Sequence, residues 1–257
     1  MQLTVLKIGG NVLNNPAALH EALDYFAGLV EPAVLVHGGG RRASELLREM
    51  GRTPVMIGGR RITDAPTLEI VTMVYAGLIN KNVVAQLQAR GTNAIGLSGA
   101  DASAVVADKR PVGEIDYGYA GDVRHVNAQL LEGLLKLGLR PVLCPITHDG
   151  AGQLLNTNAD TIAQETATAL ARHNDALEVS LRYCFELPGV LRDINDRESL
   201  IERLDAGSYA DYKAEGVIAG GMIPKLDNAF AAVAAGVREV VIGDLASLRA
   251  GRGTVVS

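Results

Sequence analysis

Apolar and polar positions follow two alternating patterns along the chain. Short, continuous apolar runs predict buried strands over residues 4–8, 33–36, 94–97, 104–107, 142–146, 179–185, 239–242 and 254–256. Apolar residues at three- and four-residue spacing predict helices after Pro16 and over residues 41–50, 65–89, 127–137, 158–172, 199–214 and 223–235. Strands that alternate with helices predict an α/β fold, a three-layer α/β/α sandwich with a central, mostly parallel sheet.

The connecting segments give little sign of a domain boundary. No repeat, low-complexity stretch or linker divides the sequence, so residues 1–257 are expected to form a single domain. A soft boundary near residues 174–176 would separate an N-lobe of residues 1–175 from a C-lobe of residues 176–257. Residues 99–126 are rich in Gly, Asp and Tyr and are expected to form hairpins over one edge of the sheet.

Composition and charge exclude several classes of protein. The 257 residues are 48% hydrophobic and 21% charged, so the chain can bury a core and is not disordered. A net charge of −5 argues against a general nucleic-acid binder. The absence of Trp and an aromatic content of 4% argue against base-stacking platforms and carbohydrate clefts.

The cysteines and the apolar runs indicate a compartment. Cys144 and Cys184 lie among apolar neighbours and are expected to be buried, reduced thiols. No CxxC motif or Cys/His cluster supports a metal site. The first residues lack the features of a signal peptide, and no apolar stretch approaches the roughly 18 residues that span a bilayer. We therefore expect a cytoplasmic protein without a membrane segment.

Two predicted strands end in glycine runs. Lys7 lies in an apolar strand before Gly9 and Gly10, where its burial is costly unless it meets an anion. A lysine that reaches solvent from an edge strand explains this pattern equally well. Residues 37–40, His-Gly-Gly-Gly, precede a helix and could form an anion nest from backbone N–H groups and the helix dipole. A purely structural turn is the alternative.

The glycine run does not match the common phosphate loops or a hydrolase. It is neither a GxxxxGK[ST] loop nor a GxGxxG fingerprint. HGGG also occurs as the oxyanion loop of esterases, but these need a GxSxG elbow. The nearest candidate, residues 96–100, Gly-Leu-Ser-Gly-Ala, fails at its last position. An esterase is therefore not supported.

Two further segments complete a possible site for phosphoryl transfer. Residues 155–160 contain Asn156, Asn158 and Asp160, which by themselves are typical of a helix cap. Gly220 and Gly221 precede a helix with Lys225 one turn inside, and the chain holds six Lys against 18 Arg. Two lysines and a glycine nest would stabilise the charge of a transferring phosphoryl group. A buried Asp160 between the two ammonium groups would hold them in place.

At these motifs the sequence resembles the amino acid kinase family. The motifs are residues 7–10, 36–40, 59–64, 156–160 and 221–225. All five occur in the order of the family and with compatible spacing, which makes the match specific. Within the family, Arg61 and the Asn-Thr-Asn-Ala-Asp run favour the branch that acts on N-acylated glutamate. The resemblance implies that ATP, with Mg²⁺, phosphorylates the side-chain carboxylate of an N-acyl-L-glutamate, a step of arginine biosynthesis. Protein metal ligands are not expected.

The resemblance also implies a role for each matched residue. Lys7 and Lys225 would neutralise the transferring phosphoryl group, and Asp160 would organise these lysines. The glycines Gly9, Gly10, Gly39 and Gly40 would face phosphate oxygens, Arg61 would bind the substrate α-carboxylate and Asn156 its N-acyl amide or carboxylate. The nucleotide side would be formed by Glu186, Gly189, Val190, Leu191, Val217, Ile218 and Ala219. The N-lobe would then hold the acylglutamate site and the C-lobe the ATP site.

The sequence departs from the family pattern near the nucleotide. The family usually has a Thr/Ser-Asp-Val-x-Gly-Val run, whereas residues 185–190 read Phe-Glu-Leu-Pro-Gly-Val. Residues 178–182 alternate polar and apolar, unlike a strand buried on both faces. Small residues in segments 99–102 and 117–122 leave room for a succinyl group as well as an acetyl group.

Assembly and alternative functions complete the expectations. The chain starts six residues before Lys7, which leaves no place for the N-terminal helix of arginine-inhibited hexameric relatives. We therefore expect an arginine-insensitive homodimer, with the helix over residues 65–89 as an interface element. A carbamate, uridylate, aspartate or glutamate 5-kinase is the second hypothesis, and a non-catalytic nucleotide sensor is the third. The two lysines and Asp160 argue against the sensor.

Overall fold

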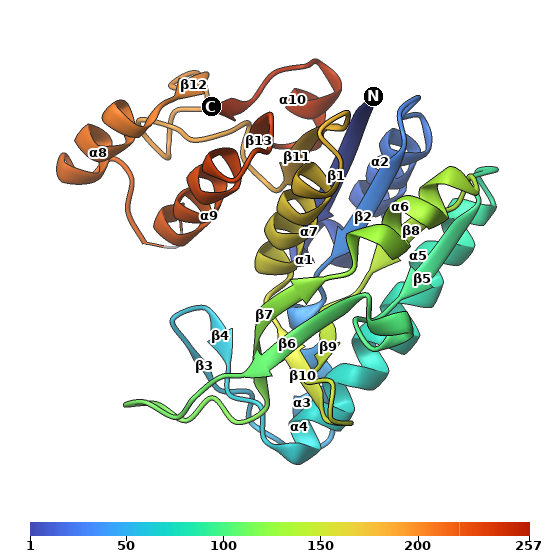
Figure 1. Cartoon of the computed structure of the whole chain (residues 1–257). Helices are drawn as coiled ribbons and strands as arrows, with labels where there is room; N and C mark the ends of the chain where they lie inside the picture. Colours follow the sequence, from blue (N-terminus) through green and yellow to red (C-terminus); the bar gives the residue numbers. More distant parts are fainter. Residues whose placement is uncertain (221) are drawn as a thin grey trace.

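The fold is described from a computed structural model, which covers residues 1–220 and 222–257 (Figure 1). Gly221, part of one predicted glycine motif, lies outside the described residues. Residues 1–175 contribute four of the eight strands of the central sheet and form a second, smaller sheet, and residues 176–257 contribute the other four strands, at one end of the central sheet.

An eight-stranded sheet forms the middle layer, in the order β12-β14-β13-β11-β1-β2-β8-β5. Its strands are β1 (Gln2–Ile8), β2 (Ala33–His37), β5 (Ala94–Leu97), β8 (Arg140–Leu143), β11 (Glu178–Cys184), β12 (Arg203–Leu204), β13 (Glu239–Gly243) and β14 (Thr254–Val256). All neighbouring pairs are parallel except β13 and β14. The sequence prediction of a mostly parallel sheet is therefore confirmed.

Helices cover both faces of this sheet (Figure 1). One face packs against α6 (Ala128–Lys136), α7 (Ala159–His173) and α9 (Met222–Ala234) around the largest core cluster. The other face packs against α2 (Pro16–Ala27), α5 (Asn80–Gln88) and α10 (Leu245–Arg249). The remaining helices are α1 (Gly10–Asn14), α3 (Gly40–Glu49), α4 (Ala65–Thr72) and α8 (Ala206–Ala214), with a short 3₁₀ turn over Asp101–Ser103. The result is the predicted α/β/α sandwich.

A closed four-stranded sheet and a small hairpin extend from this sandwich. The sheet contains β6 (Val105–Lys109), β7 (Ala120–Val126), β9 (Ile146–His148) and β10 (Leu154–Thr157), in the order β10-β7-β6-β9. The hairpin pairs β3 (Met56–Ile57) with β4 (Arg60–Arg61). The expected hairpins in residues 99–126 are therefore present as β6 and β7, which pair antiparallel. Both units lie at the lower end of the molecule in Figure 1.

Two predicted elements were wrong in extent. The strand expected over residues 142–146 is broken, because Pro145 has no backbone N–H and separates β8 from β9, which belongs to the other sheet. The helix expected over residues 199–214 covers only Ala206–Ala214. Its first part instead contains β12, and Asp205 starts the helix by accepting a hydrogen bond from Ser208 N. Strand β11, which alternates in sequence, lies inside the sheet between β1 and β13.

The long helix predicted over residues 65–89 is continuous but irregular. Asp64 caps it through Thr67 N, as its sequence predicts, and the π-helical turn η1 (Met73–Ile79) separates α4 from α5. Contrary to expectation, Ala65–Gln88 is apolar and long enough to span a bilayer by length and composition alone, with a mean hydropathy of 1.2. Val71, Val74 and Val83 are buried in the core clusters, and 39% of the apolar window of this segment is buried in the structure.

The sheet order determines where a ligand can bind. Strand β1 lies between β2 and β11, with Ile8 in register with both His37 and Cys184. The segments that follow these three strands therefore emerge side by side at the carboxyl edge of the sheet. In open α/β sheets ligands bind at this edge.

Candidate active site

Two lysines that are distant in sequence meet one carboxylate at this edge. Lys7 Nζ lies 2.7 Å from Asp160 Oδ1, and Lys225 Nζ lies 3.5 Å from Asp160 Oδ2. The side chains of Lys7, Lys225 and Asp160 are 11%, 15% and 24% exposed. The structure thus brings together the three charged residues singled out in the sequence, in a largely buried triad.

Asp160 is held by the start of a helix. It lies in the first turn of α7, where Asn158 accepts hydrogen bonds from Asp160 N and Thr161 N. Burial raises the pKa of the Asp160 carboxyl, but the charges of Lys7 and Lys225 more than compensate and hold the pKa below its usual value. Asp160 is therefore ionised at neutral pH and balances one of the two ammonium charges.

Lys225 reaches the triad from α9. Its Nζ lies 5.0 Å from the centre of the Tyr183 ring and 5.3 Å from that of Phe185, which favours a cation at this point. Burial lowers the pKa of the Lys225 ammonium, although Asp160 opposes this effect and Lys7 adds to it. Glu186 is exposed, and its charge also acts to raise the Lys225 pKa.

The glycine segments after β1 and β2 lie next to the triad and to each other. A side chain added at Gly9 would lie 3.6 Å from Lys7 Nζ, and one added at Gly38 would lie 3.8 Å from Gly10 N. Gly10 begins α1 and Gly40 begins α3, and neither helix has a side-chain cap. Uncapped helix starts leave N–H groups and a positive dipole end for an anion.

Gly39 is a position that only glycine can occupy. Its φ of +153° lies in a region that residues with a side chain rarely adopt, and an added Cβ would lie 2.6 Å from Ile79 Cδ1 and 2.8 Å from Tyr75 Cδ1. Tyr75 and Ile79 belong to the π-helical turn, which thus packs directly against the glycine loop. The loop is consequently held close to the wall of the site.

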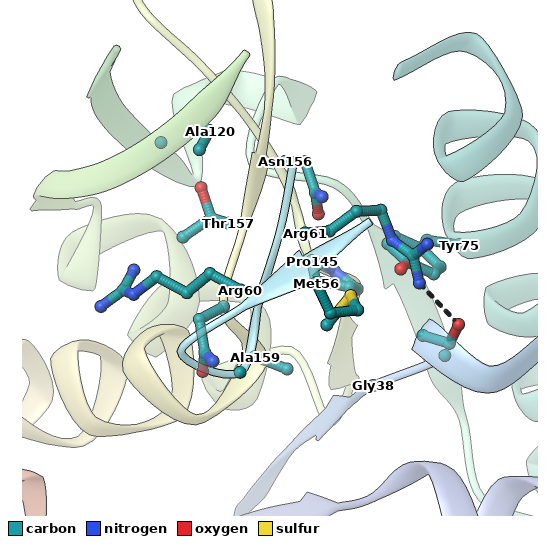
Figure 2. A pocket seen from close by; sticks show the side chains of 15 residues that line it. Gly38, Met56, Arg60, Arg61, Tyr75, Ala120, Pro145, Asn156, Thr157 and Ala159 are labelled. Carbon is teal, nitrogen blue, oxygen red and sulfur yellow. Dashed lines mark hydrogen bonds between the residues drawn. The ribbon is translucent and has the colours of Figure 1, made fainter. Parts of the chain in front are cut away.

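A cavity beside the glycine loop is lined by residues of the N-lobe (Figure 2). Arg61 is 6% exposed, and its Nη2 donates to Gly40 O and to Ser44 Oγ, both at 2.8 Å. Its Nη1 is buried without a hydrogen-bond partner among the described residues. A buried guanidinium with a free donor at a cavity is suited to bind a carboxylate.

Asn156 lies on the same cavity, at the end of β10. Its Nδ2 donates to Thr63 Oγ1 at 3.0 Å, which leaves Oδ1 to accept a hydrogen bond from a ligand. Figure 2 shows Tyr75 next to Arg61, whereas Arg60 points to the opposite side of the cavity. Neither Tyr75 nor Thr63 was predicted as a site residue. Thr63 lies in the motif of residues 59–64, which was a signal for it, whereas the apolar helix around Tyr75 gives none.

The family assignment rests on a match that spans most of the chain. The sequence model of the amino acid kinase family matches residues 2–244. The chain belongs to the amino acid kinase family. It is 52% identical over 255 residues to the acetylglutamate kinase of Parabacteroides distasonis, and the match covers 99% of both chains. It is 42% identical to the acetylglutamate kinase of Methanopyrus kandleri, with 99% and 100% of the two chains covered.

Solved structures of the family share the fold. The structure of smu.665 from Streptococcus mutans UA159 superposes with a TM-score of 0.81 at 29% identity, covering 99% of this chain and 98% of that one. Carbamate kinase from Giardia lamblia bound to AMP-PNP superposes with a TM-score of 0.71 at 14% identity, covering 99% and 97%. The predicted amino acid kinase fold is thus confirmed, and ATP use follows from the kinase family.

The residues predicted on the nucleotide side of this family fold have mixed environments. Gly189, Val190, Leu191 and Ile218 are buried, and Val190 and Ile218 belong to the main core cluster. A side chain at Gly189 would lie 2.5 Å from Leu200 and 2.6 Å from Thr254. Val217 is half-buried, and Glu186 and Ala219 are exposed. Val190 and Ile218 thus pack in the core, whereas Glu186 and Ala219 are the exposed members of this set.

The described residues offer no ready-made metal site for the family reaction. No group of three or more His, Cys, Asp or Glu in residues 1–220 and 222–257 could hold a metal ion, and Asp160 is paired with two lysines. Cys144 and Cys184 are free and buried, as predicted, and burial raises their thiol pKa to about 12 and about 11.

Proposed function

We propose that this amino acid kinase transfers the γ-phosphoryl group of ATP to the side-chain carboxylate of N-acetyl-L-glutamate, a step of arginine biosynthesis. The carboxylate oxygen forms a bond to the γ-phosphorus as the bond to the β–γ bridging oxygen breaks, so the products are an acyl phosphate and ADP. The acetylglutamate kinases at 42% and 52% identity support this substrate. The observation on which the proposal depends is the Lys7–Asp160–Lys225 triad beside two glycine loops.

The triad would act by stabilising charge. In the transition state negative charge spreads over the oxygens of the transferring group, and catalysis consists mainly of positioning and electrostatic stabilisation. Lys7 and Lys225 would contact those oxygens, and Asp160 would keep the two ammonium groups in place. N–H groups of Gly9, Gly10, Gly39 and Gly40 would add donors. Mg²⁺, bound to the ATP phosphates, would neutralise phosphate charge.

The cavity beside the glycine loop would bind the amino-acid substrate. The unpartnered Nη1 of Arg61 supports binding of the α-carboxylate, and the free Oδ1 of Asn156 supports a hydrogen bond from the N-acyl amide. ATP would bind from the C-lobe, near residues 186–191 and 217–219. The N-lobe would then supply the acceptor site and the C-lobe the nucleotide site.

A hydroxamate assay tests this function. The purified chain is incubated with MgATP, hydroxylamine and N-acetyl-L-glutamate, and the hydroxamate formed from the acyl phosphate is measured. We expect product that requires both ATP and the acylated amino acid. N-succinyl-L-glutamate in parallel tests the larger acyl group, and L-glutamate or carbamate serves as a control for other family activities. No product with any acylated glutamate would refute the proposal.

We further propose a cytoplasmic homodimer with the long helix at its interface. Met73 and Leu78 of the π-helical turn are 55% and 48% exposed, which supports an apolar contact on this face. The neighbouring β5 is the edge strand of the sheet. Light scattering after gel filtration should give twice the chain mass, and Leu78→Glu should shift it toward the monomer. A wild-type monomer would refute the dimer without affecting the proposed reaction.

A further inference from the structure

His37 and Asn80 form a buried polar pair behind the glycine loop. Their exposed fractions are 0% and 1%. His37 Nδ1 lies 2.7 Å from Gly38 O, and His37 Nε2 lies 3.2 Å from Asn80 Nδ2. Asn80 begins α5 directly after the π-helical turn. Burial of an imidazole and an amide is unfavourable unless each polar atom has a partner, so these contacts need an explanation.

The partners fix the direction of every hydrogen bond in this pair. Gly38 O can only accept, so His37 Nδ1 carries a hydrogen and donates. Asn80 Nδ2 donates to Val142 O at 2.9 Å, and Asn80 Oδ1 accepts from Lys81 Nζ at 3.1 Å, which determines the orientation of the amide. Asn80 Nδ2 therefore also faces His37 Nε2 as a donor, and Nε2 must be an unprotonated acceptor.

The imidazole is consequently neutral and held in a single tautomer. Burial is the largest effect and lowers the His37 pKa, the hydrogen bond to Gly38 raises it, and the positive charge of Lys81 lowers it, with a net pKa of about 4. Gly96 makes room for the amide, because a side chain at this position would lie 2.0 Å from Asn80 Oδ1. The network thus extends from the helix surface at Lys81 to the backbone of the glycine loop.

The hydrogen bond from His37 Nδ1 to Gly38 O orients the peptide group that joins Gly38 and Gly39. Gly38 N donates to Ile8 O at 3.0 Å, so Gly38 is held at both its N–H and its carbonyl group. In a planar trans peptide the carbonyl of one residue and the N–H of the next point in opposite directions. When His37 holds the Gly38 carbonyl, the Gly39 N–H therefore points away from the imidazole. Gly38, Gly39 and Gly40 all line the cavity.

We infer that His37 is a positioning residue, which sets the direction of the Gly39 N–H through the Gly38 carbonyl. The inference rests on the proposed function, in which this N–H stabilises the transferring phosphoryl group. His37 itself does not contact substrate and exchanges no proton with it. Its contribution is made in the transition state, because a misaligned donor loses most where negative charge develops.

Two variants separate positioning from space filling. In His37→Asn the amide nitrogen lies near the position of Nδ1 and can still donate to Gly38 O. In His37→Gln the side chain fills the pocket more completely, but its polar atoms lie near the position of Nε2. Positioning predicts that the Asn variant keeps more activity than the Gln variant, whereas space filling predicts the reverse.

The expected decrease in kcat follows from the loss of one preorganised hydrogen-bond donor. Complete removal of such a donor typically lowers kcat about 10²–10³-fold, so a misdirected N–H in His37→Gln should lower kcat at least about 10-fold. KM for ATP and for the acylated glutamate should change less than kcat. Circular dichroism and thermal melting check that both variants fold. A Gln variant as active as the Asn variant, with both folded, would overturn the inference.

A spectroscopic measurement tests the network without relying on activity. The chain has five histidines, and ¹⁵N labelling of their rings distinguishes the Nδ1–H tautomer, the Nε2–H tautomer and the imidazolium. The ring signals that are present in the wild type and absent in His37→Asn belong to His37. In the wild type these signals should show a neutral ring with its hydrogen on Nδ1, and they should be unchanged at pH 5.5. An Nε2–H or charged ring would overturn the inference. A wild type without kinase activity would refute the proposed function alone, and the spectrum would still decide the state of His37.

Discussion

Replacement of Asp160 by Asn tests the arrangement on which the proposed reaction depends. The substitution conserves the shape of the side chain and removes its charge, so the core around α7 should change little. It leaves Lys7 and Lys225 without the carboxylate that lies 2.7 Å and 3.5 Å from their Nζ atoms. Two largely buried ammonium groups then repel each other, and one amide hydrogen of the new side chain faces them.

The distances give the scale of this effect. At an effective dielectric constant of about 20, opposite charges 3.5 Å apart attract by about 5 kcal/mol before the cost of desolvation is subtracted. If half of this attraction, about 2.5 kcal/mol, holds Lys225 in its catalytic position, its loss lowers kcat roughly 70-fold. The Lys225 pKa, already lowered by burial, should fall further without Asp160, because Asp160 raises it in the wild type.

The assay separates a catalytic defect from a folding defect. Hydroxamate formation gives kcat and KM for Asp160→Asn, and urea unfolding gives its stability. Asp211→Asn, an exposed change on α8, is the matched control and should stay within about twofold of wild type in kcat. We expect a large loss of kcat, with a smaller change in KM for the acylated glutamate. A folded Asp160→Asn variant with near-normal kcat would refute the triad.

Three further changes test neighbouring features. Arg61→Lys should raise KM for the acylated glutamate about 10-fold or more, with less effect on kcat, because an ammonium cannot replace the forked donors of a guanidinium. Steady-state kinetics at saturating MgATP measure both constants. Gly39→Ala should abolish activity through its clash with Ile79, whereas Gly133→Ala, in open space on α6, should not; both are compared in the hydroxamate assay. His37 is protonated near pH 6.5 when unfolded and only near pH 4 when folded, so the unfolded state binds more protons between these values. Stability should therefore fall as pH decreases, by about 1.6 kcal/mol from pH 6.5 to pH 5 relative to His37→Asn in urea unfolding.

The contacts among the charged residues were predicted better from the sequence than the extents of some strands and helices. Glycines next to Lys7 and Lys225 stand out because buried lysines and paired glycines are both costly without a ligand. Asp160 was predicted to lie between the two lysines, although its segment is by itself typical of a helix cap. In the structure Asn158 is the cap, which leaves the Asp160 carboxylate for the lysines. The spatial meeting of residues 7 and 225 depends on the sheet order, which a single sequence does not reveal.

The errors have identifiable physical causes. Leu200, Ile201 and Leu204 have helical spacing, but Leu204 pairs with Val256 in the sheet, a contact between distant segments that outweighs local preference. The capping box of Asp205 and Ser208 was a local signal for the later helix start. Asn80 gave a weaker signal, a polar residue within an apolar helix, and its role is apparent only once Val142 and His37 are seen beside it.

The net charge of the triad explains why the fold retains a cluster of buried charges that is unfavourable for its stability. A buried pair of opposite charges is close to neutral in free energy, because desolvation offsets the attraction. Lys7, Lys225 and Asp160 together carry a net charge of +1, so one ammonium charge has no counterpart within the cluster. This excess destabilises the protein without a ligand and is compensated when an anion arrives. The anion that gains most is the one whose negative charge grows during the reaction, which is the condition for catalysis rather than for tight binding of ATP.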